Sequence, residues 1–179
     1  MTLTEATIFL QRHRIPYQTA RYEDEADYRR HLMPFPDTNN AGKSKVTALV
    51  IPAVNGVKDI ELQFNRIRGD YVFEELYFGC FCFDLVYHEP DVLEADLLDL
   101  IGRIVDGKLA VIECHDLKRK RCVSDGSFDL SDEDNVFGAP GFREAVAKIE
   151  APKTFRQKLL GQKLQYEIYD WRTYRQIVK

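Results

Sequence analysis

The dipeptide Asn55-Gly56 lies between two runs in which apolar residues recur at every second position, and it constrains the fold more than any other feature. Asn-Gly is typical of a type I′ hairpin turn, in which both central residues adopt a positive φ angle. Such a turn places Val54 opposite Val57. The same pairing continues along the strands as Ile51 with Ile60, Leu49 with Leu62 and Thr47 with Phe64, all on one face. Because turn chemistry and apolar pattern select one register, we predict a hairpin of residues 46–54 and 57–68.

The remaining sequence predicts an α+β domain with a mainly antiparallel sheet built from hairpins. Residues 71–88 are apolar on both faces, which indicates one long strand covered from both sides near the sheet centre. Residues 109–116 and 119–124 indicate a second hairpin. Helices that pack on the sheet are expected at the N-terminus, where Thr2 and Glu5 can form a capping box, at about 91–106 and at about 141–150. The conformation of residues 17–44 does not follow from the pattern, beyond a candidate short helix.

A chain of 179 residues fits a single domain, residues 1–179. The best candidate boundary is near residue 152, where a basic and aromatic C-terminal segment begins. Residues 152–179 hold seven basic and two acidic residues, a local charge of +5 in a chain of net charge -4. An acidic chain is a poor general binder of nucleic acid, because binding to phosphates needs a dense basic surface. We therefore expect no nucleic-acid partner.

The expected location is the cytoplasm. No stretch approaches the roughly 18 apolar residues of a membrane helix, so no membrane association is expected. The first residues lack the basic leader and cleavage site of a signal peptide. Four cysteines are too few for a disulfide scaffold at this length, which favours free thiols in a reducing compartment.

The cysteines are the candidate metal ligands, because four thiolates suit a tetrahedral zinc ion. Cys80 and Cys82 are two apart and would share one face of a strand, and Cys114 would lie opposite Cys122 if the second hairpin turned at Lys118. Neither pair has the spacing of a zinc knuckle, and free cysteine packs as a small hydrophobe. We predict buried thiols, no metal and no cofactor, with a zinc-stabilised structural module as one alternative.

No recognisable catalytic motif emerges from the sequence. Cys114 and His115 are neighbours in a predicted strand and project to opposite faces, so they cannot form a nucleophile–base pair. Gly42-Lys43-Ser44 resembles the end of a phosphate-binding loop, but the preceding glycine of that motif is missing and a strand follows in place of a helix. The alternative is an enzyme whose site gathers distant polar residues, with His88, Asp84 and His115 as candidates because they end apolar strands.

The C-terminal segment has the composition of an interaction surface, since Trp, Tyr and Arg dominate binding hot spots. Its candidate binding residues are Tyr166, Tyr169, Trp171, Arg172, Tyr174 and Arg175. The competing interpretation is a closing strand that packs on its own sheet. We predict a non-catalytic domain that binds a protein partner, either another protein or a second copy of the chain.

Overall fold

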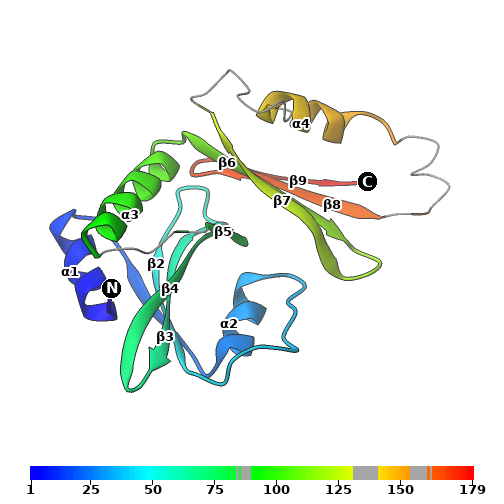
Figure 1. The fold of residues 1–179 in the computed structure, drawn as a ribbon. Coiled ribbons are helices and arrows are strands. Elements are labelled where there is room, and N and C mark those ends of the chain that lie inside the picture. Colours follow the sequence, from blue (N-terminus) through cyan, green and yellow to red (C-terminus); the bar gives the residue numbers. More distant parts are fainter. Residues whose placement is uncertain (84, 86–89, 131–140, 154–160, 162) are drawn as a thin grey trace. The chain divides into compact units, whose positions relative to one another are not determined.

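The computed structural model describes residues 1–179 except 84, 86–89, 131–140, 154–160 and 162 (Figure 1). The chain forms two compact units, Met1–Gly102 and Arg103–Lys179, called here the N-terminal and the C-terminal unit. The division falls inside a helix and not near residue 152. The predicted single domain over residues 1–179 stays a prediction, and each unit is described by itself.

The N-terminal unit is built around an antiparallel sheet with the strand order β1-β2-β3-β4-β5. In chain order its elements are α1 (Leu3–Arg12), β1 (Gln18–Tyr22), α2 (Glu25–Leu32), β2 (Val46–Ile51), β3 (Ile60–Ile67), β4 (Asp70–Phe78), β5 (Phe81–Phe83) and α3 (Pro90–Val105). The last three residues of α3 belong to the C-terminal unit. With the elements of that unit, these confirm the predicted α+β class and antiparallel pairing, although there are two sheets.

The register predicted for the first hairpin is confirmed: Ile51 pairs with Ile60 and Thr47 with Phe64. The predicted turn type is wrong, because Gly56 has a φ of +70° whereas Asn55 has no positive φ. The Asn55 side chain instead accepts hydrogen bonds from the backbone N–H groups of Val57, at 2.8 Å, and Lys58, at 2.9 Å. Asparagine therefore organises a longer connection, and the strands end at residues 51 and 60 rather than 54 and 57.

The single long strand predicted for residues 71–88 is also wrong. The chain reverses between β4 and β5, where Gly79 adopts a φ of +61°, and Phe81 pairs back onto Phe78. β5 is thus a short edge strand, and β4 lies next to it rather than at the sheet centre. The end of β4 is buried on both faces, as its apolar pattern predicted. Residues 84 and 86–88 lie outside the described part of the chain.

Helices lie on both faces of the N-terminal sheet (Figure 1). α1 and α3 lie on one side, over the buried row Leu49, Leu62 and Leu76. The predicted capping box at the start of α1 and the apolar stripe of α3 are both confirmed. α2 lies on the other side, where Tyr28 packs against Val46, Ala48 and Tyr77. The pattern indicated α2 only as a candidate short helix, and it did not predict β1, an edge strand with little apolar pattern.

The C-terminal unit contains β6 (Leu109–Asp116), β7 (Arg121–Asp129), α4 (Phe142–Glu150), β8 (Leu164–Asp170) and β9 (Tyr174–Val178). Its sheet is antiparallel with the order β7-β6-β8-β9. α4 covers one face, where Ile149 packs with Ile112 and Ile168. The second predicted hairpin and the last helix are confirmed, with β7 longer than expected. No helix within the described part of the chain is long and apolar enough to span a membrane.

Candidate functional site

Three ionisable side chains meet on the central strands of the C-terminal sheet. Glu113 and His115 are two residues apart on β6 and therefore project to the same face. Glu167 lies on β8 directly opposite Glu113 in the strand register. Their neighbours Ile112 and Ile168 pack against α4. Because side chains alternate along a strand, the three polar residues lie on the face away from α4.

The cluster is buried and closely spaced. Glu113, His115 and Glu167 are exposed by only 1%, 2% and 5%. One candidate ligand atom from each residue lies within 4.8 Å of the other two. His115 Nε2 lies 3.2 Å from Glu113 Oε2, and the Tyr169 hydroxyl donates to Glu113 Oε1. The Gln165 side chain donates to Glu167 Oε1 at 2.9 Å, so hydrogen bonds orient both carboxylates.

The charges in this cluster favour a bound cation. Two carboxylates within 4.8 Å repel by about 3 kcal/mol or more at an effective dielectric constant of about 20. A protonated His115 would supply one positive charge against two negative ones. Burial makes such an imbalance costly, and a divalent ion would remove it.

The spacing also fits a metal ion. Two ligand atoms about 2.1 Å from one ion are about 3.0 Å apart at a right angle and about 3.4 Å apart at a tetrahedral angle. The 3.2 Å between His115 Nε2 and Glu113 Oε2 lies within this range. Imidazole with carboxylates suits zinc, iron and manganese, whereas calcium and magnesium prefer oxygen ligands alone.

The structure does not place the cysteines as the sequence suggested. Cys114 lies opposite Ser124 rather than Cys122, because a β-bulge between Cys114 and His115 shifts the register. Cys80 lies in the turn between β4 and β5, so the prediction that it shares a strand with Cys82 is wrong. All four cysteines are thiols that form no disulfide. Cys114 is buried, Cys80 and Cys82 are partly buried, and Cys122 is exposed, so buried thiols were predicted correctly for part of the set.

The surroundings of Cys114 and Cys122 favour the protonated thiol over the thiolate. Burial raises the pKa of Cys114 above its ordinary value. Burial, followed by the nearby Asp125 carboxylate, raises the pKa of Cys122. Neither has the lowered pKa that marks an activated cysteine nucleophile.

The predicted C-terminal binding residues occupy different environments. Tyr169 and Trp171 are buried, Tyr166 and Tyr174 are half-buried, and Arg172 and Arg175 are exposed. Tyr166 packs against the cluster beneath α4. Arg175 forms an ion pair with Glu150 at 2.7 Å. The segment is therefore a hairpin of the sheet, with its arginines and Tyr174 as the part that a partner could reach.

Of the predicted enzyme candidates, His115 lies in the cluster, whereas His88 and Asp84 lie outside the described residues. Sequence reasoning missed Glu113 and Glu167. The spacing Glu113-x-His115 in a predicted strand was a usable signal, because it puts both side chains on one face. Glu167 joins them only through the pairing of β6 with β8, which local pattern does not reveal. No protein-family model, curated protein or solved structure matches the chain.

Proposed function

We propose that the C-terminal unit binds a divalent transition-metal ion, such as Zn²⁺, Mn²⁺ or Fe²⁺, through Glu113, His115 and Glu167. The observation that carries the proposal is the pair of buried carboxylates in register on neighbouring strands, with His115 Nε2 at 3.2 Å from one of them. Three protein ligands are also the number used by catalytic zinc sites, which keep a further position for water. The proposal therefore accommodates the enzyme alternative, and it replaces cysteines with a histidine and carboxylates.

The experiment is a titration of metal-stripped protein with ZnCl₂ and MnCl₂ by isothermal calorimetry. We expect one ion per chain for at least one of these metals. His115→Ala and Glu167→Gln should each weaken binding by at least about tenfold, because each removes one of three ligands.

A matched control is His31→Ala, since His31 Nε2 also lies 3.2 Å from a buried glutamate, Glu61. Among the described residues, no third metal-binding side chain joins His31 and Glu61 to form a three-ligand cluster. His31→Ala should bind metal like the wild type. Absence of saturable binding by the wild type, or equal binding by the His115 and His31 variants, would contradict the proposal. Circular dichroism checks that each variant is folded.

A second candidate function is the binding of a protein partner through the outer strand of the C-terminal hairpin. What supports it is that β9 is an edge strand with Arg172 and Arg175 exposed and Val178 exposed by 52%. Edge strands offer unpaired backbone groups to a partner. Arg172→Glu combined with Tyr174→Ser should abolish capture of a partner from native extract or self-association. Unchanged capture, together with unchanged oligomeric state, would contradict this function.

The expected location and partners extend this proposal. Free thiols support a cytoplasmic protein. The net charge of -4 supports the absence of a nucleic-acid partner, because counterion release would contribute little. Fractionation of the native cell and a binding assay with mixed-sequence DNA and RNA test these two points.

A further inference from the structure

We propose that the N-terminal unit holds a separate site for a small organic anion, recognised through a phosphate or carboxylate group. The site is a hollow of about 260 Å³ at the end of β1 and the start of β2. Its lining includes Arg21, Tyr22, Glu23, Lys45 and Tyr71. All belong to the N-terminal unit and are distinct from the metal ligands.

Strand pairing explains why two cations reach one hollow. Tyr22 pairs with Val46 at the end of the β1–β2 ladder, and Arg21 pairs with Thr47. Directly beyond this last pair, Glu23 follows β1 and Lys45 precedes β2. The ladder therefore brings Arg21 and Lys45 to the same end of the sheet, although they are far apart in the sequence.

Both cations are available to a ligand. Arg21 and Lys45 are exposed, and neither forms an ion pair with a carboxylate in the described ranges. Other arginines of this unit do have carboxylate partners, such as Arg12 with Glu94 and Arg29 with Glu25. Glu23 offsets one of the two charges in the hollow. The remaining positive charge attracts an anion, and the planar guanidinium can bind two oxygens of a phosphate or carboxylate at once.

The other walls favour an organic anion over an inorganic one. Tyr71 is half-buried, so it can present its ring to an apolar part of the ligand, whereas the Tyr22 ring packs against Tyr28 and His31. The volume lies just below the range of about 300–1,000 Å³ for sites of drug-sized ligands, which suits a metabolite-sized molecule. The nearby start of α1 does not serve as the anion site, because Thr2 and Glu5 form its capping box.

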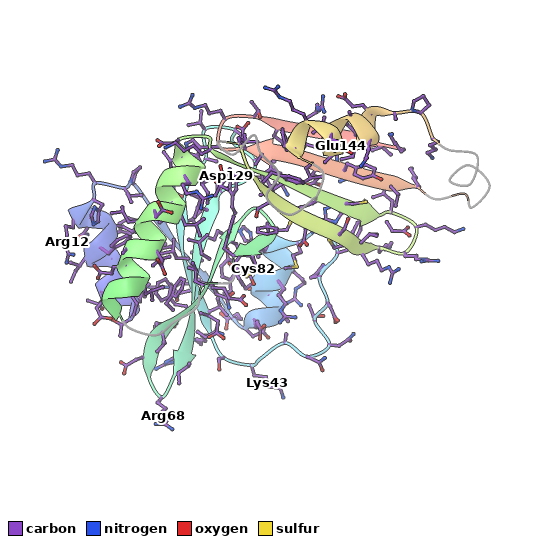
Figure 2. All side chains as sticks on the ribbon, turned by 45° about the horizontal axis from the view of Figure 1, so that its top comes forward. Arg12, Lys43, Arg68, Cys82, Asp129 and Glu144 are labelled. Carbon is purple, nitrogen blue, oxygen red and sulfur yellow. The ribbon has the colours of Figure 1, made fainter. Side chains whose placement is uncertain are left out.

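The location also gives a role to a sequence feature that failed as a phosphate-binding loop. Gly42-Lys43-Ser44 leads directly to Lys45 and the start of β2, and Lys43 itself lies on this connecting segment (Figure 2). The backbone there does not form the loop-to-helix arrangement of a nucleotide site, because β2 follows. Recognition instead depends on the Arg21 and Lys45 side chains.

The experiment is a titration of ¹⁵N-labelled full-length protein, followed by two-dimensional NMR at constant ionic strength. The probes are phenyl phosphate, benzoate and inorganic phosphate, which separate phosphate from carboxylate recognition and test the contribution of the ring. We expect saturable shifts at residues 21–23 and 45–47 with phenyl phosphate or benzoate. Inorganic phosphate should bind at least fivefold more weakly than phenyl phosphate.

Arg21→Gln and Lys45→Gln should each weaken this binding at least fivefold. Both side chains are exposed, so neither change should affect folding. Lys118→Gln is the matched control, because it removes the same charge from an exposed residue in the turn between β6 and β7. It should change binding less than twofold. The proposal is overturned if no organic probe gives saturable shifts at residues 21–23 and 45–47. It is also overturned if the Arg21→Gln and Lys45→Gln variants both bind the probe as tightly as Lys118→Gln.

Discussion

Replacement of Glu167 by glutamine should stabilise the metal-free protein, whereas it should weaken stabilisation by metal. Glutamine keeps an oxygen that can accept the hydrogen bond from Gln165, and its new amide can donate to Glu113. It removes a carboxylate that lies within 4.8 Å of the other ligands. The repulsion relieved is about 3 kcal/mol at an effective dielectric constant of about 20, and the hydrogen bonds that Gln165 and Tyr169 donate to the two carboxylates already offset part of it. We therefore expect a gain of about 1–2 kcal/mol in the unfolding free energy without metal.

Metal should reduce this stability difference. At a free ion concentration of 100 times its Kd, the wild type gains about 2.7 kcal/mol. A variant that binds tenfold more weakly gains only about 1.4 kcal/mol at the same concentration. The benefit of metal is therefore smaller in Glu167→Gln by about 1.3 kcal/mol, and the difference grows as the affinity of the variant falls.

Urea unfolding followed by tryptophan fluorescence measures these changes in the relevant unit. Trp171 is the only tryptophan in the chain. It follows β8 directly in the sequence of the C-terminal unit, and its side chain is buried. Glu144→Gln is the control, because Glu144 is an exposed residue of α4 whose carboxylate forms an ion pair with the equally exposed Lys148 (Figure 2). It should shift stability by less than about 0.5 kcal/mol and leave the metal response intact. Our reasoning is refuted if Glu167→Gln destabilises the metal-free protein, or if metal stabilises it as much as the wild type.

Three further predictions concern the N-terminal unit. Leu62→Ala should lower the unfolding free energy by about 2–5 kcal/mol in urea, because Leu62 is fully buried, and a loss below about 1 kcal/mol would mean poor packing there. The hydrogen bond that the His31 ring donates to Glu61 raises the pKa of His31 above 6.5, so the stabilisation by this pair is complete below pH 6.5 and is lost as pH rises through the folded-state pKa. Unfolding between pH 5.5 and 8.5 should show this loss in the wild type but not in His31→Asn, and identical profiles would contradict it. Gly79→Ala should lower the unfolding free energy by about 1–2 kcal/mol, because the φ angle of Gly79 is +61°. Gly102→Ala within α3 should raise it by up to about 1 kcal/mol, because an added Cβ there meets nothing within 4 Å. Equal effects of the two substitutions in thermal melts would contradict both predictions.

The sequence predicts best where one buried face restricts the choices. Leu49 and Leu62 pair as expected because a slip by one residue would turn the apolar row of β2 and β3 away from the core. The sequence also predicts the apolar stripe of α3 from Leu93 to Ile104, because five apolar residues at helical spacing lie on one face of a helix and are buried together.

Prediction fails where a local interaction leaves the apolar pattern unchanged. The two-residue connection at Gly79 and Cys80 preserves the alternation of side-chain positions from β4 into β5. The apolar pattern therefore predicts one continuous strand where the chain reverses. At Asn55 the side-chain hydrogen bonds compete with the type I′ geometry that the dipeptide usually adopts. In each case the φ angle of a single glycine, which apolar periodicity does not encode, decides the course of the chain.

The candidate site was only half visible for a different reason. Glu113 and His115 share a face through local geometry, which a strand prediction supplies. Glu167 reaches them through pairing between strands that are separated in the sequence by β7 and α4. Such non-local pairing depends on the whole fold and not on propensity.

The most direct measurement is the anomalous scattering of crystals of the full chain grown with saturating Zn²⁺ or Mn²⁺, recorded at the absorption edge of the metal. We predict one anomalous peak per chain, about 2.0–2.2 Å from a carboxylate oxygen of Glu113, a carboxylate oxygen of Glu167 and a ring nitrogen of His115. Crystals that diffract well at saturating metal but show no peak among these three side chains would contradict the proposed metal centre.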